Sequence, residues 1–269
     1  MISIIVPVYN RAKTITQCIT SIIESAHTDL EIVIVDDAST DTTYNECYQL
    51  MEQDNRIRLV KNSINRGAAY ARNRGLTLIE GEHVCFVDSD DLLPQDALTS
   101  LLSDPDVDLV CGEYQLFLNG VETDKPAIAK RNKHFDKESF LVDVIYPYLK
   151  VPRGHHMLAV TWGKLFKTSI IRKHNIKYND TVNKYEDGQF ILDYVTHIKN
   201  CLLITDVVYT YQAVNRDYGN TLFNFMSMLS TVERFLTNMD PSDKAEILLE
   251  CYQYFLKREM HRQGLLDLL

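Results

Sequence analysis

Apolar and polar positions follow two different periods along the first part of the chain. Short apolar runs, each followed by apolar residues three or four positions apart, predict strands followed by amphipathic helices. We expect strands at residues 2–8, 31–35, 57–60, 83–87 and 108–117, with helices near 15–26, 44–51, 67–79 and 95–102 between them. This βαβα order is typical of a mostly parallel sheet covered by helices.

The pattern changes after about residue 118. Residues 119–133 are polar and predict turns. Further helices are expected at 136–150, from 168, and at 186–198, with a strand at 202–211 and a helical tail after 220 in which Asp240 and Pro241 resemble an N-cap and first-turn pair. We therefore expect an α/β fold in three parts: residues 1–117, residues 118–220 and a C-terminal helical extension, 221–269.

Composition narrows the class of protein. With 269 residues, 45% of them hydrophobic, the chain can bury one large core or a core with a smaller lobe. A net charge of −9 argues against a nucleic-acid partner. No apolar run approaches the length of a membrane span and no basic leader precedes the first strand, so a soluble, cytoplasmic protein is expected. The six cysteines form no CxxC pair and are expected to be reduced and buried.

Acidic residues crowd at the ends of two predicted strands. Asp88, Asp90 and Asp91 follow strand 83–87, and Asp36 and Asp37 end strand 31–35. Carboxylates held this close resist ionising together unless a cation lies between them, and their hard oxygens suit Mg²⁺ or Mn²⁺. The alternative is that both clusters only start helices, because acidic groups favour helix N-termini. Asp91 in particular is expected to cap the helix after Pro94.

Glycine is absent from the position where many nucleotide sites require it. The first glycine is Gly67, so the turn after the first strand is neither a Walker loop nor a dinucleotide-binding turn. A bound pyrophosphate would have to be neutralised by a metal and by side chains.

Five ordered motifs resemble those of family 2 glycosyltransferases. They are Ile4–Asn10 (IIVPVYN), Val35–Asp41 (VDDASTD), Asn65–Gly67 with Ala71–Gly75 (NRG, ARNRG), Asp88–Asp91 (DSDD) and Tyr185–Asp187 (YED). The resemblance implies a GT-A fold, a nucleotide-sugar donor such as a UDP-sugar, a divalent metal (Mn²⁺ or Mg²⁺) and inversion at the anomeric carbon. It makes residues 1–117 the nucleotide-sugar-binding half and 118–220 the acceptor-binding and catalytic-base half.

The resemblance also implies a role for each matching residue. The nucleotide would be bordered by Pro7, Val8 and Tyr9 at the base and ribose and by Asp36 and Asp37 at the uracil ring, and it would be held by Asn65 and Arg72. Asp88 and Ser89 would lie near the ribose and the metal, and Asp90 would bind the metal with Asp88. Arg216 would approach the donor phosphate. Asp187, with Glu186 beside it, would be the catalytic base that accepts the proton of the acceptor hydroxyl.

Several readings stay open at this point. Glu186 and Asp187 could merely cap a helix, and Trp162 could be a core residue or a sugar-stacking platform. His155 and His156 are not expected to bind a metal, because adjacent loop histidines rarely face one ion. The function that follows is transfer of a sugar from a UDP-sugar to a saccharide or lipid-linked saccharide, in surface polysaccharide assembly. The alternative is a non-catalytic nucleotide-sugar or carbohydrate-binding module on the same fold.

The C-terminal segment carries basic residues interleaved with apolar ones: Lys257, Arg258, His261 and Arg262 precede the leucine-rich end. Such a pattern favours packing or a homo-oligomer contact, with a peripheral membrane contact as the alternative.

Overall fold

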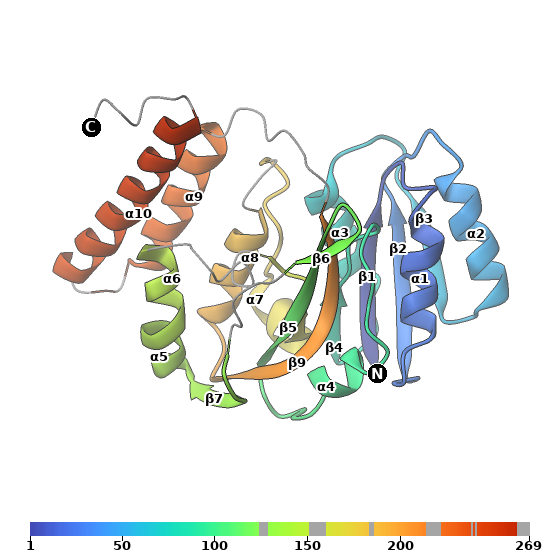
Figure 1. Cartoon of the computed structure of the whole chain (residues 1–269), viewed down its shortest axis with the longest axis horizontal. Helices are drawn as coiled ribbons and strands as arrows, with labels where there is room; N and C mark the ends of the chain where they lie inside the picture. Colours follow the sequence, from blue (N-terminus) through green and yellow to red (C-terminus); the bar gives the residue numbers. More distant parts are fainter. Residues whose placement is uncertain are drawn as a thin grey trace.

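A single mixed β-sheet runs through the computed structural model of the chain (Figure 1). The structure describes residues 1–123, 129–150, 160–182, 186–213, 222–237, 239 and 241–262. The sheet in these residues comprises β1 (Ile2–Val8), β2 (Leu30–Asp36), β3 (Ile57–Lys61), β4 (His83–Phe86), β5 (Leu109–Leu118), β6 (Val121–Thr123), β7 (Lys133–Asp136), β8 (Lys164–Lys167) and β9 (Asn200–Ala213). Its order is β3-β2-β1-β4-β8-β5-β9-β7, and β6 pairs with β5.

Most of the described strands point in one direction. β1 is parallel to β2 and β4, β2 is parallel to β3, and β5 is parallel to β9. Because β8 is antiparallel to both β4 and β5, these two strands point the same way. Only β6, β7 and β8 are reversed among the strands described. The predicted mostly parallel α/β sheet is therefore confirmed, with β8 as a reversed strand that the pattern did not predict.

Helices flank the sheet and extend beyond one end of it (Figure 1). They are α1 (Ile15–Ile23), α2 (Thr43–Gln53), α3 (Ala68–Leu76), α4 (Ala97–Leu101), α5 (Lys137–Phe140), the π-helical turn η1 (Leu141–Ile145), α6 (Tyr146–Lys150), α7 (Thr168–His174), α8 (Glu186–Val195), α9 (Leu222–Phe235) and α10 (Pro241–Arg262). α10 packs against α6 and α9, at the end of the molecule opposite to α1 and α2. The helical tail is thus confirmed, and Pro241 opens α10 as expected of a first-turn proline.

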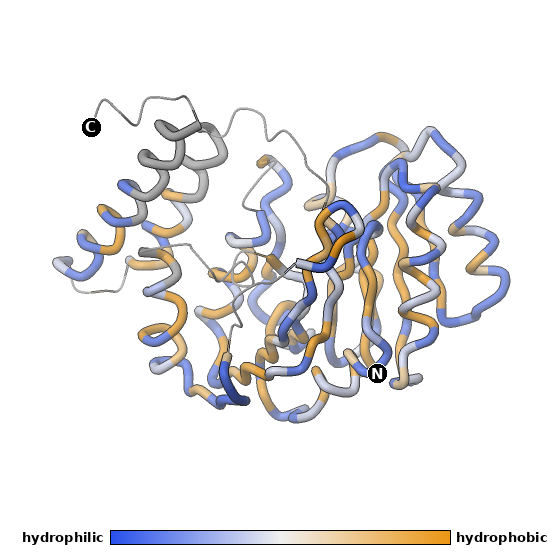
Figure 2. The backbone as a smooth tube through the Cα atoms, viewed as in Figure 1, coloured by the Kyte–Doolittle hydropathy of each residue, from blue (hydrophilic) through white to orange (hydrophobic). Residues whose placement is uncertain are grey.

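The central strands explain why the hydrophobic pattern was informative. Every residue of β1 is buried, as is nearly every residue of β2, and Figure 2 shows apolar residues along both. Both faces of these strands are covered, so their sequences read as continuous apolar runs. The buried residues of α1 are Ile15, Cys18, Ile19 and Ile22, which is the spacing of one helical face.

A hairpin begins the stretch that was predicted to be polar and rich in turns. β5 and β6 pair with Leu118 opposite Val121, so that Asn119 and Gly120 form a two-residue loop. Both loop residues have positive φ, 51° for Asn119 and 82° for Gly120. Asn-Gly is the typical sequence of such a hairpin turn, because both residues tolerate this conformation. A turn is therefore present in this stretch as predicted, whereas the short strand β6 that follows it was not predicted.

An aromatic cluster packs helix α8 against the sheet. Phe86 on β4, Phe166 on β8 and Phe190 on α8 meet edge-to-face with centroids 5.6 to 5.9 Å apart. Tyr178 stacks on Phe190 at 4.4 Å. Such aromatic pairs add about 0.5–1.5 kcal/mol each beyond the burial of their area. Together they set the position of α8, which carries Glu186 and Asp187 at its first turn.

Two expectations from composition can be compared with the described residues. Cys18, Cys47, Cys85, Cys111 and Cys201 are buried and unbridged, as predicted for reduced cysteines. In the part of the chain that the structure describes, no helix combines the length and the apolar character needed to cross a bilayer.

Gly75 lets α3 approach β1, and this contact is testable. A Cβ at Gly75 would lie 2.5 Å from Cγ2 of Ile5, a fully buried and β-branched residue that has little room to turn. We expect Gly75→Ala to lower the free energy of unfolding by about 1–2 kcal/mol, because overpacking outweighs the gain in helix propensity. Urea denaturation measures the change, with Gln49→Ala on the exposed face of α2 as a near-neutral control. Equal stability of both variants would contradict the tight contact.

Candidate functional site

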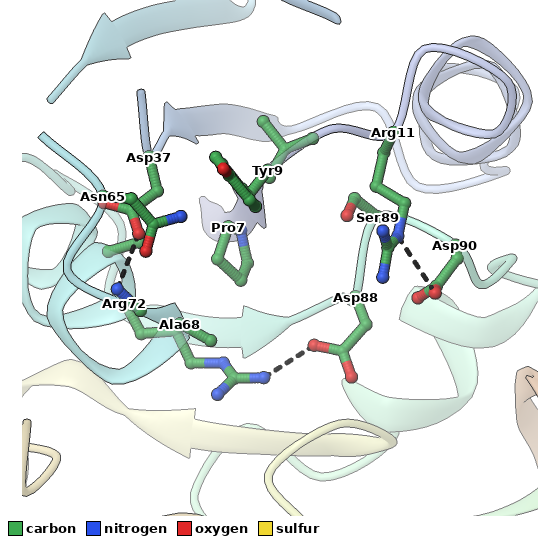
Figure 3. Close-up of a pocket in the computed structure, with 13 residues that line it drawn as sticks. Pro7, Tyr9, Arg11, Asp37, Asn65, Ala68, Arg72, Asp88, Ser89 and Asp90 are labelled. Atoms are coloured by element: carbon green, nitrogen blue, oxygen red, sulfur yellow. Dashed lines mark hydrogen bonds and ion pairs between the residues drawn. The ribbon is translucent and has the colours of Figure 1, made fainter. Parts of the chain in front are cut away.

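A cavity of about 430 Å³ opens at the carboxyl ends of β1, β2 and β4 (Figure 3). Ligands bind in this part of open α/β sheets because neighbouring loops diverge there. The cavity is lined by Pro7, Val8, Tyr9, Arg11, Asp37, Asn65, Gly67, Ala68, Ala71, Arg72, Asp88, Ser89 and Asp90. Four of the five sequence motifs, which are far apart along the chain, therefore meet at one place.

The loop after β1 is held by hydrogen bonds from the loop after β2. Asn10 adopts a positive φ of 51°, its backbone N–H donates to Ser39 Oγ at 3.0 Å, and its Oδ1 accepts from the N–H of Thr40 at 2.9 Å. Thr14 Oγ1 donates to the carbonyl of Ser89 at 3.0 Å, which links this loop to the acidic motif. The cavity wall formed by Pro7, Val8 and Tyr9 is thus fixed without any glycine.

Asp37 shapes the opposite wall of the cavity. Its Oδ1 accepts from Asn62 Nδ2 at 2.6 Å, and its Oδ2 accepts from the backbone N–H groups of Arg66 and Gly67 at 2.9 and 2.7 Å. These bonds hold the loop that brings Asn65 to the cavity. A carboxylate can accept about four hydrogen bonds. Asp37 therefore retains acceptor capacity toward a ligand after forming these three.

Asp36 does not lie at the cavity as its neighbour Asp37 does, although a place at the uracil ring was predicted for both. Its side chain is fully buried, and it does not line the cavity. Its Oδ1 accepts from the N–H of Ser39 at 3.2 Å, and its Oδ2 lies 3.5 Å from Lys61 Nζ. Alternate residues of a strand point to opposite faces, so only one of the two adjacent aspartates reaches the cavity. Asp36 supports the loop that in turn holds Asn10.

Arg72 is the buried cation of the site. Its side chain is 5% exposed, and Nη2 donates to Asp88 Oδ1 at 2.7 Å (Figure 3). Nη1 lies 3.3 Å from Asp187 Oδ1 and 3.9 Å from Glu186 Oε1. Its Nε and Nη1 are buried and make no hydrogen bond within the described residues. Burial alone would lower the pKa of Arg72, but Asp187 and Asp88 raise it well above its usual value, so the guanidinium stays charged.

Asp187 is connected to the cavity by its ion pair with Arg72, and a hydrogen bond from one threonine holds it in place. Thr161 Oγ1 donates to Asp187 Oδ1 at 3.1 Å and accepts from the hydroxyl of Tyr178 at 2.8 Å. Lys164 Nζ donates to the carbonyl of Val160 at 2.6 Å and so braces the segment that presents Thr161. These contacts direct Asp187 toward the cation at the cavity, which helix capping alone does not require. Thr161 and Tyr178 were not predicted, because no sequence spacing links them to Asp187.

Glu186 lies beside Asp187 at the start of α8. Burial raises the pKa of Glu186, and the nearby charge of Asp187 raises it further, although Arg72 opposes both. Burial raises the pKa of Asp88 as well, again against the effect of Arg72. Three carboxylates therefore surround the single positive charge of Arg72.

Arg11 is a cavity residue that the sequence analysis missed. Its Nε donates to Asp90 Oδ2 at 3.2 Å, and its Nη1 donates to the carbonyl of Asn10 at 3.2 Å (Figure 3). The signal that could have found it is its position: a cation directly after the first strand, where glycine-rich sites place backbone N–H groups.

Asp91 has a structural role that its neighbours do not share. It is 1% exposed; its Oδ2 accepts from the hydroxyl of Tyr209 at 2.8 Å, and its Oδ1 accepts from the N–H of Gln212 at 2.7 Å. The predicted helix cap after Pro94 is therefore wrong. Instead, Asp91 joins the acidic motif to β9, and the Tyr209 hydroxyl also accepts from the N–H of Asp88 at 3.0 Å.

The donor set can be tested against a divalent cation. Among the residues described, no three His, Cys, Asp or Glu side chains form a ready-made metal cage. Asp88 and Asp90 nevertheless line the same cavity and offer hard carboxylate oxygens. Mg²⁺ and Mn²⁺ are commonly held by one or two carboxylates together with substrate phosphates. The residues present fit a metal bound together with a nucleotide.

The remaining predicted residues fall into two groups. Trp162 is 4% exposed and stacks on Tyr209 with centroids 4.5 Å apart, so it is a core residue and not a sugar platform. Arg216, His155 and His156 lie outside the described residues.

The parallel strands with a reversed β8, and an acidic cavity at their carboxyl ends, define a protein of the GT-A fold class. Comparison with known proteins agrees. The crystal structure of Staphylococcus aureus TarS 1–349 in complex with UDP-GlcNAc has the same fold, with a TM-score of 0.73 and 22% identity over 97% of this chain and 72% of that one.

Sequence comparisons identify the family. The model of glycosyl transferase family 2 matches residues 3–167, more than half of the chain. The poly(ribitol-phosphate) beta-N-acetylglucosaminyltransferase TarP of Staphylococcus aureus is 30% identical over 82% of this chain and 68% of its own length. The glycosyltransferase GlyG of Streptococcus pneumoniae is 37% identical over 42% of this chain, which spans 39% of its length. The chain belongs to glycosyl transferase family 2.

The buried carboxyl of Asp91 predicts a pH dependence of stability. Burial raises its pKa to about 8, and the charge of Asp88 adds to the rise. In an unfolded chain the pKa is about 3.9. Because the folded state binds this proton more tightly, the stabilisation is fully present below about pH 4 and is lost as the pH rises toward 8.

We expect Asp91→Asn to gain stability relative to the wild type between pH 5 and pH 8.5, by about 4 kcal/mol. Asparagine can still accept from Gln212 and meet the Tyr209 hydroxyl, but it does not titrate. Urea denaturation in the presence of a chelator measures the difference at each pH. The exposed Asp206→Asn serves as the control. A difference that does not change with pH would show that Asp91 is ionised throughout.

Proposed function

We propose that this protein is an inverting glycosyltransferase that moves a sugar from a UDP-sugar to a hydroxyl group of a saccharide or lipid-linked saccharide, in the assembly of a surface polysaccharide. The observation that carries the proposal is the position of Arg72, which contacts Asp88 at the cavity and Asp187 on α8. A single buried guanidinium thus joins the candidate donor site to the candidate base. The relatives support the donor class, since TarS was crystallised with UDP-GlcNAc and TarP is named as an N-acetylglucosaminyltransferase.

The nucleotide would occupy the cavity between the loops after β1, β2 and β4. Pro7, Val8 and Tyr9 would border the base and ribose, and the remaining acceptor capacity of Asp37 would meet the uracil ring N–H. Arg72 lines this cavity and would lie near the diphosphate, where its Nε makes no hydrogen bond in the described residues; a buried donor left without one costs about 1–3 kcal/mol. A volume of about 430 Å³ is within the range of small-molecule sites.

Asp90 and Asp88 are the residues that would hold a divalent cation. When bound, such a cation would neutralise the charge that develops on the departing diphosphate. Arg72 and Arg11 add positive charge to the same region.

Asp187 would act on the acceptor. Its carboxylate would accept the proton of the attacking hydroxyl while the oxygen forms a bond to the anomeric carbon and the bond from that carbon to the diphosphate oxygen breaks. The hydrogen bond from Thr161 and the ion pair with Arg72 would hold the carboxylate in place during the attack. General bases of this kind contribute about 10²–10⁴ in rate.

The proposed setting is the cytoplasm, where the C-terminal helices could mediate self-association, packing or a peripheral membrane contact. Leu249 and Tyr252 are exposed apolar residues on α10. Such residues could contribute to self-association or to a membrane contact.

Replacing the candidate base separates catalysis from binding. We expect Asp187→Asn to lower sugar transfer by at least about 10²-fold while the affinity for UDP changes only a few-fold, because the base acts on the acceptor and not on the nucleotide. UDP release from candidate UDP-sugars with Mn²⁺ and an acceptor measures transfer, and calorimetry measures UDP affinity. Asp193→Asn, on the same helix and paired with Arg234 at 3.6 Å, is the matched control. Equal turnover would remove Asp187 from the mechanism, and a binding module would release no UDP at all.

Thr161 is expected to position Asp187. Thr161→Val keeps the shape of the side chain but removes its hydroxyl, so the hydrogen bond to Asp187 is lost and Tyr178 loses its acceptor. We expect kcat to fall about ten-fold with little change in KM for the donor. Thr161→Ser should restore most of kcat, because it restores the hydroxyl. If Val and Ser behave alike, the hydroxyl has no role in positioning the base.

A further inference from the structure

Each of the two candidate metal ligands is paired with its own arginine. Arg72 Nη2 lies 2.7 Å from Asp88 Oδ1, and Arg11 Nε lies 3.2 Å from Asp90 Oδ2. Figure 3 shows both pairs at the cavity, with Asp88 and Asp90 on the same segment. The two carboxylates that would bind a divalent metal ion therefore already form ion pairs with arginines of the protein.

The two arginines differ in their freedom to move. The side chain of Arg72 is 5% exposed and faces three carboxylates, whereas that of Arg11 is 35% exposed. The backbone of Arg11 is fixed, because its N–H donates to Thr43 Oγ1 at 2.7 Å and its carbonyl accepts from Thr14 and Ile15. Only the Arg11 side chain can therefore leave its carboxylate without disturbing the fold.

A dication and a guanidinium compete for one carboxylate, since the positive charges repel each other when both lie within a few ångströms. A diphosphate offers the guanidinium a stronger, bidentate partner than a single carboxylate does. The arrival of a nucleotide in the cavity would thus supply Arg11 with a new anion and release Asp90 for the metal.

We propose that Arg11 is an exchangeable counterion of Asp90: it occupies this carboxylate in the nucleotide-free protein and transfers to the diphosphate when the nucleotide binds. This inference rests on the proposed function, because it takes a nucleoside diphosphate and a divalent cation as the ligands. Its consequence is that UDP and the metal each strengthen the binding of the other, with Arg11 carrying part of that coupling. By linkage the coupling has the same size in both directions.

The test measures Mn²⁺ binding by calorimetry with and without UDP, for the wild type and for Arg11→Met. Without UDP, we expect the variant to bind Mn²⁺ about three- to ten-fold more tightly, because Asp90 has lost its competitor. With Mn²⁺ present, we expect it to bind UDP about ten-fold more weakly, because the contact between Arg11 and the diphosphate is missing. The factor by which UDP strengthens Mn²⁺ binding should therefore fall by up to about ten-fold.

Lys13→Met is the matched control. It removes one positive charge two residues away, from an exposed side chain that does not line the cavity. It should keep the coupling factor of the wild type. Arg11→Lys retains the charge with a shorter reach and should give intermediate values, and thermal unfolding of each variant verifies that it is folded.

The substitution Asp90→Asn is expected to strengthen UDP binding, whereas Arg11→Met is expected to weaken it. Replacing this carboxylate frees Arg11 for the diphosphate, so UDP binding in chelator should become about two- to five-fold tighter than in the wild type. The same substitution in the Arg11→Met background should give no such gain. A purely structural role of the ion pair predicts no gain in either background.

The outcomes separate this inference from the function it rests on. If wild-type UDP and Mn²⁺ binding are coupled but Arg11→Met binds metal no more tightly without UDP, the exchange is overturned and the proposed function stands. If the wild type binds no UDP, or binds it equally with and without Mn²⁺, both are overturned.

Discussion

The buried guanidinium of Arg72 is the interaction on which the site depends. It comes from α3, which Gly75 brings close to β1, and it meets Asp88 at the end of β4 and Asp187 and Glu186 at the start of α8. A charge buried this deeply is tolerable only when opposite charges surround it. The ion pairs therefore constrain where β4 and α8 can lie, and they connect the part of the chain that forms the cavity to the part that carries the candidate base.

The fold of the first half could be predicted from the sequence because its physics is local. β1 and β2 are buried on both faces and read as apolar runs, and α1 shows one apolar face. The reversed β8 was not predictable in this way. Lys164–Lys167 is only four residues long and joins β4 to β5 through pairings that are distant in sequence. The β5–β6 hairpin was predictable, since Asn119-Gly120 carries the turn signal.

In the acidic motif, residue type alone does not tell which carboxylate can bind a ligand and which is structural. Asp88, Asp90 and Asp91 look equivalent in the sequence, yet Asp91 bonds Tyr209 and Gln212 on β9, more than a hundred residues away. The same holds for the adjacent aspartates after β2, of which Asp37 reaches the cavity and Asp36 supports a loop. Direction and partner, not chemical type, separate a ligand from a structural carboxylate, and both are set by tertiary contacts.

The unsatisfied groups of the structure are informative when they are considered together. Buried polar atoms normally find hydrogen-bond partners, but in the described residues Nε and Nη1 of Arg72, at the cavity, and the buried Oδ2 of Asp36 make no hydrogen bond. Carboxylates around the cavity outnumber the arginines, and burial raises the pKa of Asp88, Asp91 and Glu186. A site of this kind lowers the stability of the empty protein. Its excess carboxylates call for a cation, and Arg72 Nε keeps a donor that makes no hydrogen bond. A diphosphate bound together with a divalent metal would bring both a cation and an acceptor to the site.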